Sequence, residues 1–165
     1  MTAQATDTAV STSVLVEAPQ QLAFEVFTKD MAGWWPPEHH ILEGELDRMV
    51  FELKEGGRIY DVGVDGGECQ WARVLVFEPP ERVVISWDIT PRWKLQTDPE
   101  KASEVEFRFV PESEGRTRVE LEHRHLDRHG EGWEGMRDAV GSADGWNHNL
   151  RAFAARAQEV GVERR

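Results

Sequence analysis

The stretch from residue 142 to residue 160 constrains the fold most, because it predicts a single amphipathic helix. Its apolar side chains recur at helical spacing and form one stripe, made of Trp146, Leu150, Phe153, Ala157 and Val160. Ser142 or Asp144 can cap the start of this helix, and Gly161 can end it. Short helices gain most of their stability from packing an apolar face against other elements. The rest of the chain must therefore build an apolar surface for this helix to cover.

Alternating apolar and polar residues indicate that this surface is a β-sheet. One such segment spans 10–18, and six more follow, joined by short turns: 48–54, 58–64, 68–77, 82–90, 103–110 and 117–125. Helices are predicted over 19–29, around 30–35 and over 129–140. This order predicts an α+β fold whose antiparallel sheet is covered on one face. We expect one domain over 9–161, preceded by a frayed tail over 1–8.

Composition excludes several classes of function. A net charge of −12 at pH 7 disfavours a nucleic acid or an anionic membrane surface as a partner, because both attract basic proteins. Cys69 is the single cysteine, so an internal disulfide is excluded. The first ten residues lack the features of a signal peptide, and no apolar run is long enough to span a membrane. We therefore expect a cytoplasmic protein.

Four segments give the sequence a family resemblance. They are VEAPQQLAFEVFTKDMAGWWPPEHH (16–40), LKEGGRIYD (53–61), VLVFEPPERVVISWD (74–88) and VELEHRHL (119–126), the last followed by Gly-Trp and a helix. In this order they resemble the family named after the activator of the heat-shock-protein-90 ATPase, part of the START-like superfamily with the birch pollen allergen and polyketide cyclases. The resemblance covers roughly residues 10–160. It implies a helix-grip fold, in which a curved antiparallel sheet grips the long C-terminal helix around a cavity for hydrophobic or aromatic small molecules.

Tryptophan is the unusual component of the sequence, with seven residues against one tyrosine. An indole buries a large apolar area and also seeks a partner for its N–H, so these residues either fill the core or line the implied cavity. Of the adjacent Trp34 and Trp35, one is expected in the core and one at the rim. Trp87 lies on the inward face of its strand. Tyr60, Trp71 and Trp93 can also face the cavity, although a one-residue shift of register would turn each of them away.

Histidines are the candidate polar groups of the cavity. His123 and His125 share one strand face, where they can bind a ligand, act as acid or base, or form structural hydrogen bonds; for His125 we expect partial exposure. A zinc site would need further ligands, and none stands at a recognised spacing, so no metal is expected. His39 and His40 are adjacent on an extended segment, so they should point to opposite sides and share no ligand.

These observations lead to one hypothesis and two alternatives. The first is a non-enzymatic domain that binds a hydrophobic or aromatic small molecule, without a cofactor, because no nucleophile elbow, P-loop, dinucleotide pattern or metalloprotease helix is present. The second is an enzyme of the polyketide cyclase or aromatase kind, with His123 as general acid or base. The third is a module that binds a chaperone, and the residues give no positive evidence for this function. The sequence is also compatible with a homodimer. The candidate cavity residues are Trp34, Trp35, Tyr60, Trp71, Trp87, Phe107, His123, Trp133, Trp146, Asn149 and Leu150.

Overall fold

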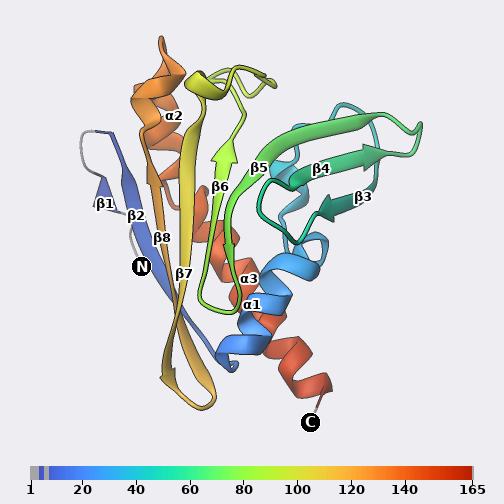
Figure 1. Cartoon of the computed structure of the whole chain (residues 1–165), viewed down its shortest axis with the longest axis vertical. Coiled ribbons are helices and arrows are strands. Elements are labelled where there is room, and N and C mark those ends of the chain that lie inside the picture. The colour runs from blue at the N-terminus through green and yellow to red at the C-terminus, as the bar shows by residue number, and fades with distance from the viewer. Residues whose placement is uncertain (1–3, 6–7, 165) are drawn as a thin grey trace.

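The computed structural model describes residues 4–5 and 8–164 and consists of one antiparallel sheet with helices packed on it (Figure 1). Its strands are β1 (Gln4–Ala5), β2 (Val10–Val16), β3 (Leu46–Phe51), β4 (Arg58–Gly63), β5 (Glu68–Glu78), β6 (Arg82–Trp87), β7 (Ser103–Ser113) and β8 (Arg116–Arg124). They are hydrogen-bonded in the order β1-β2-β8-β7-β6-β5-β4-β3. The α+β helix-grip fold predicted from the sequence is confirmed.

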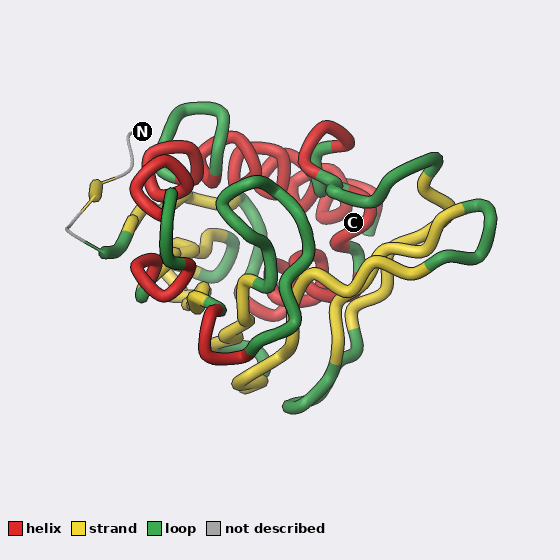
Figure 2. Tube along the Cα trace, turned by 90° about the horizontal axis from the view of Figure 1, so that it is seen from above, coloured by secondary structure: helices red, strands yellow, loops and turns green. Residues whose placement is uncertain are grey.

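The helices are α1 (Gln20–Lys29), α2 (Trp133–Val140) and α3 (Trp146–Glu163), with short 3-10 turns η1 (Met31–Gly33), η2 (Pro37–His39), η3 (Pro99–Lys101) and η4 (Leu126–His129). Figure 1 shows α3 crossing one face of the sheet, with α1 beside its C-terminal half. In Figure 1 and in Figure 2, which is seen from above, the hairpin of β4 and β5 extends to one side of the molecule. No helix within residues 4–5 and 8–164 is long and apolar enough to cross a membrane.

The apolar stripe of the C-terminal helix forms the centre of the core, as predicted. Trp146, Leu150, Phe153, Ala157 and Val160 are all buried. They pack against the inward side chains of the sheet, in the same cluster as Ile85 and Phe107. Burial of this helix face stabilises the packing of α3 on the sheet.

The predicted ends of this helix are wrong. Ser142 donates its hydroxyl hydrogen to the carbonyl oxygen of Ala139, at the end of α2, and makes no cap for α3. The residue before α3 is Gly145, and a side chain there would collide with the backbone oxygen of Val140, which would lie 2.4 Å from its Cβ. Gly161 does not end the helix, because the chain stays helical to Glu163. Close approach of α2 and α3, which the sequence pattern does not encode, decides the start of the helix.

Two other expectations on local structure need correction. The strand predicted over 82–90 ends at Trp87, and Ile89 forms only an isolated bridge with Leu95. In the predicted tail, Gln4–Ala5 pair with Val10 and Ser11 of β2, whereas residues 1–3 and 6–7 lie outside the described residues. The sheet therefore begins before the first strand expected from the sequence.

Candidate functional site

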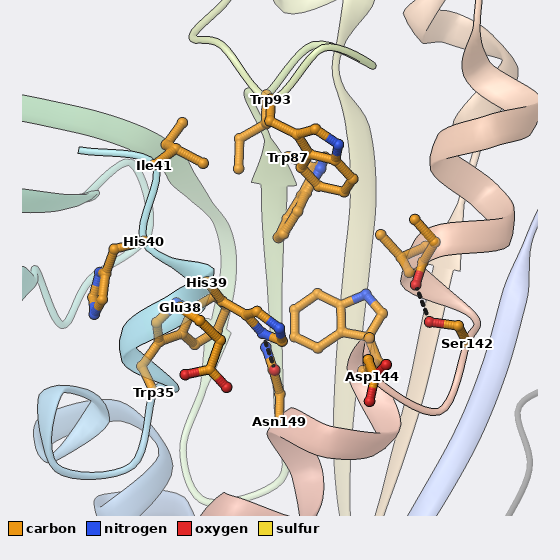
Figure 3. Close-up of a pocket in the computed structure, with 15 residues that line it drawn as sticks. Trp35, Glu38, His39, His40, Ile41, Trp87, Trp93, Ser142, Asp144 and Asn149 are labelled. Carbon is orange, nitrogen blue, oxygen red and sulfur yellow. Dashed lines mark hydrogen bonds between the residues drawn. The ribbon is translucent and has the colours of Figure 1, made fainter. Parts of the chain in front are cut away.

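A pocket of about 530 Å³ opens where the start of α3 meets the end of β6. Its walls come from four parts of the chain: the segment around η2, the end of β6 with the loop after it, the end of α2, and the first turn of α3 (Figure 3). The lining residues are Trp35, Glu38, His39, His40, Ile41, Trp87, Ile89, Trp93, Ala139, Val140, Ser142, Asp144, Gly145, Trp146 and Asn149. This volume lies within the range of about 300–1,000 Å³ that is usual for small-molecule sites.

Four tryptophans form a closed ring of contacts beside the pocket. The ring centroids are 4.9 Å apart for Trp35 and Trp71, 5.8 Å for Trp71 and Trp87, 5.4 Å for Trp87 and Trp146, and 5.9 Å for Trp146 and Trp35. Three of these pairs meet edge to face, the arrangement that the charge distribution of aromatic rings favours. Trp35, Trp87 and Trp146 line the pocket, whereas Trp71 does not. The pocket therefore has one wall of mutually packed indoles.

A buried chain of hydrogen bonds fixes the position of Trp146 from the side that faces the core. Its indole N–H donates to Nδ1 of His123 over 3.1 Å, and Nε2 of His123 lies 2.8 Å from Oγ of Ser103. Oγ of Ser103 lies 2.6 Å from Nε2 of His129, which also accepts from the backbone N–H of Ser103. Because an indole can only donate, His123 must carry its own proton on Nε2 and donate it to Ser103, whose hydroxyl in turn donates to His129. The chain thus runs in one direction, from Trp146 to His129.

Both histidines of this chain are held neutral. Burial lowers the pKa of His123 to about 3, with a further contribution from His129, and burial lowers the pKa of His129 to about 4 against the opposing charge of Asp88. Removal of water penalises the charged form of an imidazole. His123 has both ring nitrogens occupied and is not among the lining residues. It positions Trp146 and has no free nitrogen for a ligand.

The adjacent His39 and His40 secure the segment that forms the opposite wall. Nδ1 of His39 lies 2.5 Å from Oδ1 of Asn149 in α3, whereas Nδ1 of His40 lies 2.7 Å from Oδ2 of Asp61 in β4. Figure 3 shows the two imidazoles turned away from each other, as expected. The expected extended backbone is wrong for His39, which ends the 3-10 turn η2, and only His40 is extended. Asp61 is fully buried, and its other oxygen has no partner among the described residues. Both histidines line the pocket.

One buried donor of the pocket wall is unused. Trp87 is 5% exposed, and its indole N–H has no hydrogen-bond partner within the described part of the chain. A buried donor without an acceptor costs free energy, because it has lost its hydrogen bond to water. A ligand atom that accepts a hydrogen bond from this N–H would remove that cost. It contrasts with the N–H groups of Trp146 and Trp34, which donate to His123 and to the carbonyl oxygen of Val26.

The structure brings only some of the predicted site residues to the pocket. Trp35, Trp87, Trp146 and Asn149 line it. Five others are buried but are not among the lining residues: Trp34, Trp71, Phe107, His123 and Leu150. Two are only half-buried and also lie outside the lining: Tyr60, under the guanidinium of Arg58, and Trp133, under that of Arg137.

Sequence reasoning missed the loop residues of the pocket. Glu38, His39 and His40 follow Trp34-Trp35-Pro36-Pro37 directly, and this dense run of aromatic and proline residues was the one available signal. Trp93, which the sequence offers as a cavity residue, lies on the lining of the pocket and is 42% exposed. Loops carry no periodic pattern, so the direction of their side chains follows from tertiary contacts. Within residues 4–5 and 8–164, no group of three His, Cys, Asp or Glu side chains is arranged to hold a metal ion.

Two solved structures of similar proteins carry a functional description. One is Txn09, described as an anthrahydroquino-gamma-pyrone synthase complexed with SUM, which is 40% identical over 90% of this chain and 96% of its own, with a TM-score of 0.65. The other is CalC from Micromonospora echinospora, described as a self-sacrificing resistance protein, which is 30% identical over 94% of this chain and 97% of its own, with a TM-score of 0.68. Ms6760 from Mycobacterium smegmatis is 18% identical, covers 94% of both chains at a TM-score of 0.64, and shares the fold.

No curated protein matches the sequence. A family model does match, over residues 17–158, and its description is activator of Hsp90 ATPase homolog 1-like protein. The matched range contains every lining residue of the pocket. The chain belongs to the family of activator of Hsp90 ATPase homolog 1-like proteins.

Proposed function

We propose that this protein binds a flat, fused-ring aromatic molecule in the tryptophan-walled pocket. The observation that carries the proposal is the set of four lining indoles: Trp35, Trp87 and Trp146 in the wall and Trp93 at the rim. Aromatic faces and edges favour aromatic ligands over aliphatic ones of equal area, because ring pairs gain an additional electrostatic contribution. Txn09, which is 40% identical to this chain, is described as an anthrahydroquino-gamma-pyrone synthase, and this description supports a fused-ring aromatic ligand here.

Binding can be tested by isothermal titration calorimetry with anthraquinone, and with dodecanol as an aliphatic control. We expect saturable binding of anthraquinone and much weaker binding of dodecanol. Trp93→Ala should weaken anthraquinone binding about tenfold, since the exposed indole offers the ligand one stacking face. Leu95→Ala is the matched control, because Leu95 is exposed to the same extent, 43%, and does not line the pocket. Equal affinity of the wild type and Trp93→Ala would place binding elsewhere, and no binding would refute the proposal.

Catalysis of a ring closure is the second candidate, and His39 is the residue that favours it. His123, the acid or base expected from the sequence, has no free nitrogen, whereas His39 lines the pocket with only Nδ1 engaged. The relative with 40% identity is described as a synthase. The test is incubation with a hydroxyaryl ketone that carries a conjugated multiple bond. An isomer of equal mass, formed by the wild type and absent with His39→Phe, would support catalysis, and an unchanged substrate would count against it.

A further inference from the structure

The imidazole of His39 has one nitrogen fixed and one left for a ligand. The amide oxygen of Asn149 accepts a hydrogen bond from Nδ1 of His39 at 2.5 Å, which places the proton of a neutral ring on Nδ1. Nε2 then keeps its lone pair and acts as an acceptor. Figure 3 shows this ring reaching from η2 to Asn149 across the pocket. Asn149 is buried, so the oxygen that orients the ring is itself held in place by α3.

The charged neighbours of His39 do not compete for this nitrogen. Glu38 accepts from Nε2 of His148 over 2.9 Å, and the ring of His148 meets that of His39 edge to face with centroids 5.5 Å apart. The pKa of Glu38 is lowered by a hydrogen bond from its own backbone N–H, then by His148, so it remains a carboxylate. Asp144 also lines the pocket. Among the described residues, neither carboxylate is hydrogen-bonded to the ring of His39.

The pocket offers no fixed positive charge to an anionic ligand. Among the described residues that line it there is no lysine and no arginine, while two carboxylates, Glu38 and Asp144, are present. A ligand that enters as a carboxylate or a phosphate would therefore be repelled. A neutral ligand that carries a hydroxyl group can donate to Nε2 of His39 without this penalty.

We propose that the pocket selects neutral aromatic molecules with a phenolic hydroxyl, and that Nε2 of His39 accepts the hydroxyl proton. In the step, the O–H bond breaks, an N–H bond forms at Nε2, and the electron pair stays on oxygen, which leaves a phenolate beside an imidazolium. No further reactant is needed. Asn149 is a positioning residue in this scheme, because it keeps the acceptor nitrogen on the ligand side. The inference rests on the proposed function, since it concerns the ligand of the same pocket.

The test compares two probes that differ by one hydroxyl, anthraquinone and 2-hydroxyanthraquinone. Affinity is measured by calorimetry, and the visible absorption of bound 2-hydroxyanthraquinone reports phenolate formation, because the phenolate absorbs at longer wavelength than the phenol. The wild type should bind the hydroxylated probe about tenfold more tightly, the size of one well-placed hydrogen bond. Its bound spectrum should be that of the phenolate.

His39→Phe should abolish both the preference and the spectral change while still binding anthraquinone, which shows that the variant is folded. Asn149→Leu should reduce the spectral change. His125→Asn is the control, because this histidine is exposed, does not line the pocket, and has a left-handed backbone that asparagine tolerates. If all variants bind both probes equally, or if the bound probe keeps the phenol spectrum, the role of His39 is refuted while the binding function stands. If neither probe binds the wild type, the proposed function and this inference both fail.

Discussion

The indole nitrogen of Trp146, at the first residue of α3, donates a hydrogen bond to Nδ1 of His123 at 3.1 Å across the interface between helix and sheet. Trp146 faces the pocket on one side, and His123 is buried on the other. This bond joins the pocket wall to the chain of Ser103 and His129 behind it. The position of one pocket tryptophan is therefore fixed by polar groups of the core.

Replacement of Trp146 should cost more stability than replacement of Trp87. Both indoles belong to the same ring of four, but the N–H of Trp146 has an acceptor and that of Trp87 has none among the described residues. Trp146→Phe leaves Nδ1 of His123 without a donor, so we expect it to lower the free energy of unfolding by about 1–2 kcal/mol more than Trp87→Phe. Urea denaturation of both variants measures the difference. Equal losses would show that the Trp146–His123 bond contributes nothing.

Stability should fall as the pH drops below the ordinary histidine pKa. His123 and His129 have folded-state pKa values of about 3 and 4, against 6.5 for an ordinary histidine. Above pH 6.5 neither state takes up a proton at these residues, so their contribution is fully present. Below 6.5 the unfolded chain binds protons that the folded protein excludes, so the free energy of unfolding decreases by about 1.4 kcal/mol per pH unit for each histidine.

The variant His129→Gln isolates this effect. Its unfolding free energy should fall less steeply than that of the wild type between about pH 6 and pH 5, by about 1.4 kcal/mol per pH unit. This interval lies above 4.5, the ordinary pKa of a glutamate carboxyl such as that of Glu106. Titration of carboxyl groups changes the free energy of unfolding mainly at lower pH. Parallel curves for the two proteins would mean that His129 is protonated equally in both states.

Removal of His40 should leave a buried carboxylate without a partner. Asp61 is 0% exposed, and its one hydrogen bond within the described residues is to Nδ1 of His40. We expect His40→Phe to destabilise the protein by about 2–3 kcal/mol, the cost of leaving a buried charged acceptor without its hydrogen bond. Adding Asp61→Asn should recover at least about 1 kcal/mol, because the uncompensated charge is gone. A double variant as unstable as the sum of the two single ones would contradict this account.

Cys69 should be unreactive in the folded protein. Burial, with a further contribution from the charge of Asp61, raises the pKa of its thiol to about 11, and the residue is 6% exposed. Since the thiolate is the reactive form, a disulfide reagent such as dithionitrobenzoate should label native protein at neutral pH far more slowly than urea-unfolded protein. The released chromophore gives both rates directly, and similar rates would show that the β4–β5 region opens readily.

The fold could be predicted from the sequence because its signals are periodic. The alternation of Val119, Leu121 and His123 placed all three on the buried face, and the stripe from Trp146 to Val160 placed α3 on the sheet. A strand or helix that buries one face shows a period of 2 or 3.6 in its apolar residues whatever element packs against that face. The pattern can therefore be identified without knowing which element that is. Tyr60 shows the limit, since the pairing of β4 with β5 shifts its register between Ile59 and Tyr60. Such an irregularity leaves no mark in the pattern.

Patterns along the chain predict the fold class, the order of most helices and strands, and the burial of many indoles. The arrangement of the pocket depends on three-dimensional packing: Trp35, Trp87 and Trp146 share one wall, His123 accepts from Trp146, and the Nε2 of His39 makes no hydrogen bond within the described residues. These two kinds of feature have different physical origins. Burial of a face is a property of neighbouring residues, whereas a pocket and its hydrogen bonds depend on side chains as far apart as His39 and Asn149, whose meeting follows from the packing of the whole chain.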